Sequence, residues 1–307
     1  MTIHIPPAGQ PGPSGLDRAV EESLLDDAPV VGRRGHAVTT LTRLGRKPGF
    51  VVAVVLIVFV VLTAFVPSWF TGFDPTATSP KDRLLSPTLL HPFGTDELGR
   101  DLWTRMLHGS ALTIKATLIA LSIAVVVGLT LGVVSGFFGG LVDVVLMRLV
   151  DVLLAVPSLL FALAIVTALG FGTVPVAIAV GIGIVPGFAR TTRAEVLRVK
   201  TLPYVEAARA GGASWLRVLV RHVLPNSWGP VLVLVVLDTG VAIIAIASLS
   251  FLGFGAAPPA AEWGTLISNG RNFLITAPWV SLLPGLFVGA VVLSLNHISK
   301  TLQELGR

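Results

Sequence analysis

The chain has 307 residues, of which 53% are hydrophobic and only 13% are charged, well below the charged share of a typical soluble domain. It contains no cysteine, which excludes disulfides, thiolate metal sites and cysteine nucleophiles. A net charge of +5 would indicate a nucleic-acid partner in a soluble protein, but loop Lys and Arg record topology in a membrane protein. No nucleic-acid partner is therefore expected.

Charged residues are clustered and leave long neutral stretches between them. Four of these stretches hold 26 residues between Lys47 and Asp74, 27 between Lys115 and Asp143, 38 between Asp151 and Arg190, and 28 between Arg271 and Lys300. A helix needs roughly 20 apolar residues to cross a bilayer. The runs are continuous rather than alternating, which excludes a membrane β-barrel. An all-α polytopic membrane protein is predicted.

Residues 1–49 are predicted to form a cytoplasmic tail, largely disordered, with a basic membrane-proximal end. The first 32 residues or so are rich in Pro, Gly, Asp and Glu, and they lack the apolar core of a signal peptide. The basic end contains no acidic residue and carries Arg33, Arg34, Arg43, Arg46 and Lys47. Because basic flanks stay inside, the first span, residues 50–70, is expected to start in the cytoplasm.

Residues 72–112 are predicted to form an extracytoplasmic loop, since four basic and five acidic residues give it no positive bias. Within it, Leu98, Leu102 and Met106 recur four apart. This spacing predicts an amphipathic helix on the membrane surface, starting at Thr95 or Asp96.

The second span is expected over about 113–136. Gly128, Gly132 and Gly136 lie four apart on it, a pattern that allows another helix to pack closely.

The third span is expected over about 142–168, with a kink at Pro157, and the fourth over about 173–189. Arg148 and Asp151 are three residues apart on the third span. We expect them to form a structural intramembrane pair.

Residues 190–221 hold seven basic residues against two acidic ones, which indicates a cytoplasmic segment. A short helix is predicted from Thr201 or Leu202, with Pro203 in its first turn. Gly211 and Gly212 should break this helix.

Ser214 should cap a second short helix, which is predicted to end near Val223 because Pro225 follows. The product is a helix–turn–helix, residues 201–225. It could be a solvated loop, a docking element for a cytosolic partner, or a DNA-binding motif, since Arg217 and Arg221 share one face. Membrane spans on both flanks argue against DNA binding.

The fifth span is expected over about 229–252 and the sixth over about 279–298. The outer loop between them, 253–278, is expected to lie at the membrane interface, with Trp263 and Trp279 at headgroup level. The result is a permease core, residues 113–300, that holds spans two to six. Both termini are predicted to be cytoplasmic.

The cytoplasmic segment resembles the signature of permease subunits of binding-protein-dependent ABC importers. That signature is Glu-Ala-Ala, three residues, Gly, nine residues, Ile, one residue, Leu-Pro. The matching residues, at the same spacing, are Glu206, Ala207, Ala208, Gly212, Leu224 and Pro225. His222 replaces the Ile, and an Arg-His pair such as Arg221-His222 is frequent in the peptide-importer branch.

Three further stretches are similar to the second, C-type, permease of dipeptide and oligopeptide importers. They are His91–Gly109, Met147–Leu160 and Ser248–Trp279. The resemblance covers nearly everything from residue 40 onward. It implies the six-helix fold of type I importer permeases in a bacterial inner or plasma membrane.

The resemblance also implies partners: a second permease subunit, two ATP-binding subunits or domains, an extracytoplasmic substrate-binding protein and the lipid bilayer. ATP and Mg would be bound by the ATPase subunits, because this chain has no G-x-x-x-x-G-K-[ST] loop. We expect no cofactor, metal or catalytic residue in it, and no enzymatic activity of its own. The residues expected to couple it to the ATPases are Glu206, Ala207, Ala208, Gly212, Arg217, Leu224 and Pro225.

Asp238 stands alone inside the fifth span. An intramembrane carboxylate marks a functional site by default, and here it could line the translocation path or make a structural hydrogen bond. It also supports the main alternative, an ion-coupled secondary transporter with Asp238 as the coupling carboxylate. No internal repeat of the kind found in such transporters is evident. A membrane-anchored regulator is a third possibility, for which six spans would be excessive.

Overall fold

The computed structural model describes residues 47–305, so the expected tail and its basic residues before Lys47 lie outside the described part. Within this part every regular element is a helix. The longer helices are α3 (Pro48–Phe65), α4 (Leu102–Phe138), α5 (Gly140–Ala155), α6 (Ser158–Leu169), α7 (Thr173–Lys200), α10 (Leu224–Phe251) and α12 (Trp279–Leu305). The shorter ones are η1 (Pro67–Trp69), η2 (Pro80–Asp82), α8 (Pro203–Ala210), α9 (Trp215–Val218), η3 (Leu219–Val223), α11 (Trp263–Gly270) and η4 (Arg271–Phe273).

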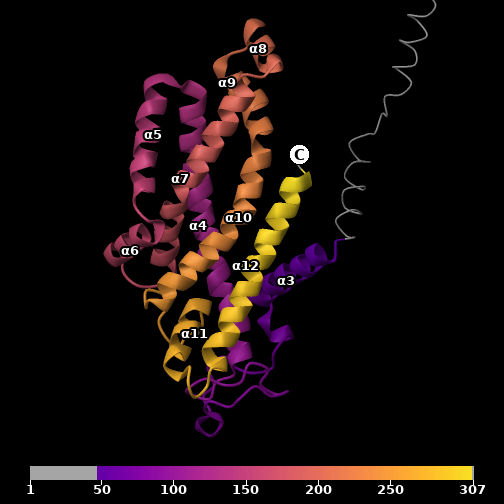
Figure 1. Ribbon diagram of the computed structural model, residues 1–307, viewed down its shortest axis with the longest axis vertical. Helices are drawn as coiled ribbons and strands as arrows, with labels where there is room; N and C mark the ends of the chain where they lie inside the picture. Colours follow the sequence, from indigo (N-terminus) through magenta and orange to yellow (C-terminus); the bar gives the residue numbers. More distant parts are fainter. Residues whose placement is uncertain (1–46, 306–307) are drawn as a thin grey trace, which may run out of the picture. The chain divides into compact units, whose positions relative to one another are not determined.

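The helices of this part run between two ends, which we call the α8 end and the α11 end (Figure 1). Phe137, at the close of α4, packs with Val205 of α8. At the opposite end, Gly172 ahead of α7 donates a backbone hydrogen bond to Phe254, 2.9 Å away. Thus α4 finishes at the α8 end and α7 starts at the α11 end, so α5 and α6 together must cross between them.

Five helices in the described part are long and apolar enough to cross a membrane, and the bent α5–α6 pair provides a sixth crossing. The predicted all-α architecture with six spans is confirmed, with the α5–α6 pair counted as one span. The third span differs from the prediction, because α5 and α6 meet at 92° rather than forming one kinked helix. Val156 adopts the extended conformation that a residue before proline favours, and this interrupts the helix at Pro157.

The predicted glycine stripe is confirmed as the contact between α4 and α7. A Cβ atom added at Gly128 would lie 2.4 Å from Cβ of Phe188, and one at Gly132 would lie 2.6 Å from the Ala189 carbonyl oxygen. At Gly136 the nearest atom, Cγ1 of Val196, would be 2.9 Å away. Only glycine lets the two backbones approach this closely, which is how membrane helices gain packing contacts.

The predicted amphipathic helix on the membrane surface is wrong. The chain is not helical from Arg83 to Asp101, and the Asp101 carboxylate caps α4 by accepting the Thr104 amide at 2.6 Å. Helix α4 then continues without interruption to Phe138. Leu102 and Met106 are buried among other helices, whereas Leu98 lies outside the helix and is exposed. The four-residue spacing therefore reflected core packing.

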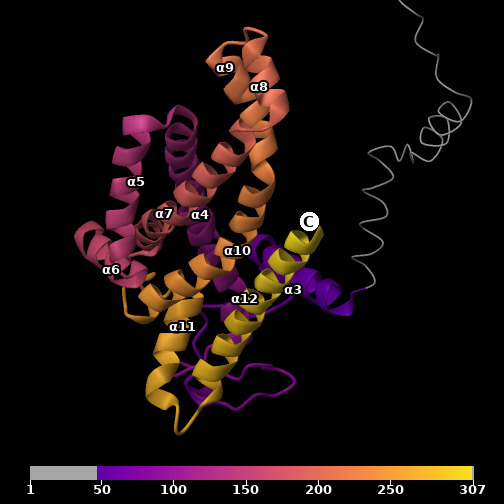
Figure 2. The ribbon, with the colours of Figure 1, turned by 45° about the horizontal axis from the view of Figure 1, so that its top comes forward.

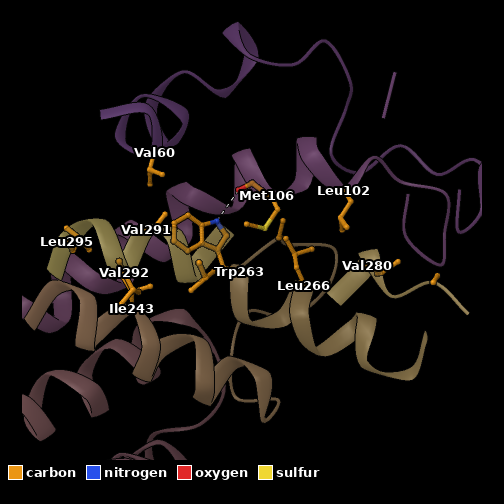
Figure 3. Packing of buried hydrophobic residues seen from close by; sticks show 13 residues of the cluster. Val60, Leu102, Met106, Ile243, Trp263, Leu266, Val280, Val291, Val292 and Leu295 are labelled. Carbon is orange, nitrogen blue, oxygen red and sulfur yellow. Dashed lines mark hydrogen bonds between the residues drawn. The ribbon is translucent and has the colours of Figure 1, made fainter. Parts of the chain in front are cut away.

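Trp263 is the centre of the core at the α11 end (Figure 3). Its side chain is fully buried, and its indole N–H donates to the Met106 carbonyl oxygen at 3.1 Å. The expectation that Trp263 lies at headgroup level is therefore wrong.

Candidate coupling site

Helix α8 is fixed to the bundle through one buried side chain, Val205. It starts after Leu202, with Pro203 in its first turn, as predicted. Val205 has no exposed surface and packs in a cluster with Val199 of α7 and Phe137 of α4. The opposite face of α8 is left in contact with solvent.

The turn after α8 depends on Gly212, as the sequence predicted. Its φ of +81° lies in the left-handed region, which side chains disfavour, while nothing lies within 4 Å of where its Cβ would be. The glycine is needed for its backbone angle and not for space. Ser214 then caps α9 by accepting the Arg217 amide at 3.4 Å, as expected.

The predicted end of the second short helix is wrong, because α9, η3 and α10 form one helix from Trp215 to Phe251. Pro225 cannot donate a backbone hydrogen bond, yet the helix passes through it. The π-helical turn of η3 precedes it, and the Asn226 side-chain amide donates to the His222 carbonyl oxygen at 2.6 Å. The candidate coupling segment, residues 201–225, is therefore continuous with a helix long enough to cross a membrane.

The exposed surface of this segment combines apolar and charged side chains. Figure 2 shows its helices α8 and α9 at the tip of the α8 end. Of the expected coupling residues, Glu206, Ala207, Gly212, Arg217 and Pro225 are exposed, and Ala208 and Leu224 are half-buried. Large apolar side chains lie beside them, with Tyr204, Trp215 and Leu216 exposed by 43%, 58% and 54%. Such a mixture suits a protein partner better than free solvent.

Two residues that sequence reasoning missed attach the segment to α4. The ammonium group of Lys200 donates to the Phe137 carbonyl oxygen at 2.6 Å, a favourable position for a cation at a helix C-terminus. The guanidinium of Arg209 lies 5.8 Å from the centre of the Phe137 ring. In the sequence, the aromatic pair Phe137-Phe138 just after the predicted second span was the feature that could have indicated these contacts.

The expected pair of Arg148 with Asp151 is not formed. Asp151 instead accepts a hydrogen bond from Arg190 of α7 at 2.6 Å. Arg148 is exposed on α5, and within residues 47–305 it has no ion-pair partner. A second link between the same helices joins Arg193 to Asp143 through two hydrogen bonds of 2.6 Å. Helix spacing alone predicted an intrahelical pair, but packing of α5 on α7 provides interhelical ones.

Asp238 lies on α10, well away along the chain from the coupling residues. Its side chain is half-buried, and within residues 47–305 it makes no hydrogen bond or ion pair. Among the described residues, the expected structural hydrogen bond of Asp238 to another helix is therefore not formed; one to a second permease stays an expectation. A carboxylate left in this state needs water, cargo or another subunit as its partner.

Comparison with known proteins shows clear relatives. The model of the family described as "Binding-protein-dependent transport system inner membrane component" matches residues 128–305. A putative peptide transport system permease protein of Brucella suis biovar 1 is 39% identical over 279 residues, which cover 90% of this chain and 93% of that protein. The probable D,D-dipeptide transport system permease protein DdpC of Escherichia coli K12 is 38% identical, covering 84% and 87% respectively.

Solved structures show the same fold at low sequence identity. The inward-facing MetNI methionine ABC transporter gives a TM-score of 0.52 at 16% identity, covering 64% of this chain and 96% of that one. An amino acid ABC transporter gives a TM-score of 0.51 at 17% identity, covering 64% and 91%.

Proposed function

Because the chain belongs to the binding-protein-dependent transport system inner membrane component family, we propose that it forms a peptide-translocation path together with a second permease. It is a multi-pass inner-membrane permease subunit of an ABC importer. Peptides are the proposed cargo because the curated relatives include permeases named for peptides and dipeptides. ATP and Mg are assigned to two partner ATPase subunits or domains, and cargo delivery to an extracytoplasmic binding protein.

The α8 end is assigned to the cytoplasm, because segment 190–221 carries seven basic residues against two acidic ones. The observation that carries the coupling role is the arrangement of α8. One face is held by fully buried Val205, and the other presents Glu206 and Ala207 to solvent. A partner that binds this exposed face can move α8 as a rigid element.

Motion of α8 would reach the membrane through the unbroken helix from Trp215 to Phe251. Asp238 lies on that helix and is proposed to face the translocation path. Its carboxylate would attract the α-amino group of a peptide. ATP-driven closure of the ATPases would then shift the population between inward-open and outward-open states.

The coupling proposal is tested with Glu206→Arg. The tagged chain is purified from native membranes in mild detergent, its partners are identified and ATP hydrolysis is measured. We expect the substitution to release the ATPases or uncouple them, because it places a cation in the contact without touching the core. Glu195→Arg on α7 is the matched control, since it makes the same charge change next to the segment. Equal loss with both variants would contradict the proposal.

If no ATPase accompanies the unmodified chain after gentle extraction, the ABC coupling role fails. The alternative, ion-coupled transport through Asp238, would then be measured as proton flux into vesicles.

A further inference from the structure

A cavity of 460 Å³ lies at the α11 end, away from the coupling segment. Its walls come from four parts of the chain: the stretch before α4, the start of α4, the α6–α7 turn, and the link from α10 through α11. This volume is within the range of pockets that hold small molecules.

The charged wall of the cavity is built from side chains that are themselves buried. Arg100 and Arg105 line it and are exposed by only 6% and 2%. Asp96 lies beside both, accepting Nε–H of Arg100 at 2.7 Å and lying 3.5 Å from Nε of Arg105. Glu97 completes the wall.

Two atoms of this wall lack hydrogen-bond partners within residues 47–305, although they are buried. They are Nε of Arg105 and Oε2 of Glu97. Arg105 is otherwise held by a bond from Nη1 to the Pro75 carbonyl oxygen at 2.9 Å. Both atoms are closed to solvent; Nε of Arg105 lies 3.5 Å from the Asp96 carboxylate, and the other Glu97 oxygen lies 3.6 Å from Nη2 of Arg100. These ion pairs leave hydrogen-bonding capacity unused, which a ligand that reaches Arg105 with a carboxylate and Glu97 with an ammonium group can supply.

The charges in the wall identify the class of ligand. Two guanidinium groups and two carboxylates cancel, so the cavity does not favour a simple anion over a simple cation. A zwitterion matches both signs at once. The remaining lining is mostly small or apolar, with Phe171, Ala257 and Pro258 among it, and leaves room for short side chains.

We propose that this cavity binds a short peptide by its free termini, with the carboxylate at Arg105 and Arg100 and the ammonium group at Glu97. The inference rests on the proposed function and adds a cargo site at the α11 end of the permease. It also adds a selection rule, that both ends of the peptide must be unblocked.

The test measures binding of radiolabelled dialanine to the full chain, purified with the subunits that accompany it but without the binding protein. C-terminal amidated dialanine, N-acetyl dialanine and free alanine are the competing probes. Dialanine should bind at least about tenfold more tightly than either blocked form, because each block removes a charged hydrogen bond. It should also bind more tightly than alanine, which is too short to reach both charged groups.

Two variants locate the site. Arg105→Gln should weaken binding of dialanine and remove the preference for a free carboxylate. Ala257→Trp should obstruct the cavity from its exposed rim, so it tests the site even if Arg105→Gln disturbs folding. Arg83→Gln and Ala77→Trp are the controls, since they make the same chemical changes at exposed positions that do not line the cavity.

Equal binding of the amidated peptide or of alanine, or unchanged binding by Ala257→Trp, would overturn the proposal. Uptake of dialanine into vesicles separates this failure from failure of the proposed function. If the complex imports dialanine and Ala257→Trp imports it equally well, the cavity site is wrong while peptide import stands. If the complex imports no peptide at all, both fail.

Discussion

Gly132 of α4 lies directly against the Ala189 carbonyl oxygen of α7, and a Cβ atom at Gly132 would come within 2.6 Å of that oxygen. No flexible side chain can move aside there, because the contact is to backbone. We expect Gly132→Ala to lower the free energy of unfolding by on the order of 1–3 kcal/mol, the usual cost of overpacking. The midpoint of thermal unfolding in detergent measures it.

Gly187→Ala on α7 is the control for that change. Nothing lies within 4 Å of its Cβ position, so the added methyl group meets no neighbour. Alanine also favours helix over glycine by up to about 1 kcal/mol, so this variant should be as stable as the parent or more so. Equal destabilisation by both substitutions would show that the contact at Gly132 is unimportant.

Val205→Ala should loosen α8 from the bundle. The side chain is fully buried against α7 and the end of α4, and its truncation should cost about 1–3 kcal/mol of local stability. Hydrogen exchange should therefore accelerate in residues 203–210 and little elsewhere. Val220→Ala makes the same chemical change at a side chain that is 54% exposed, and it should leave α8 protected.

Asp238→Asn should reduce peptide transport while leaving assembly intact. The carboxylate has no hydrogen-bond or ion-pair partner within the described residues, so its loss breaks no such bond among them. Loss of one charged contact to cargo corresponds to roughly a tenfold decrease in transport. Asp238→Glu keeps the charge and should retain much of the activity. Normal transport by the Asn variant, with full ATPase stimulation, would remove Asp238 from the path.

Glu262 makes stability depend on pH. It is fully buried ahead of α11, and burial raises its pKa above the ordinary 4.5, although Ser250 and the Ala256 amide each donate to it at 2.9 Å. The unfolded chain loses this proton first, so stability falls as pH rises from about 4.5 through the raised pKa. Below 4.5 the group is protonated in both states and contributes no slope.

Glu262→Gln should remove this part of the pH dependence. An amide oxygen can still accept the Ala256 hydrogen bond, and its NH₂ group can donate to Ser250. Unfolding midpoints of both proteins, measured from pH 4.5 to 8, should diverge in favour of the Gln variant as pH rises. A constant difference across this range would contradict ionisation of Glu262 as the cause.

Local signals predicted some elements well and others poorly. Pro203, Gly212 and Ser214 gave the start of α8, the turn and the cap of α9, because each acts through its own backbone or its nearest neighbours. Pro225 misled the prediction, since the helix continues through it after the π-helical turn of η3. Periodicity at Leu102 and Met106 was genuine, but it could not tell a membrane surface from a protein core.

The sequence by itself determined the membrane class, the number of crossings, the glycine contact and the turn at Gly212 after α8, because these depend on runs of apolar residues and on local spacing. Only the tertiary structure decided that Asp151 pairs with Arg190, that Trp263 is buried and that Arg100 and Arg105 wall a cavity. Those facts depend on which helices pack together, and side chains far apart in the chain meet only once the helices have assembled.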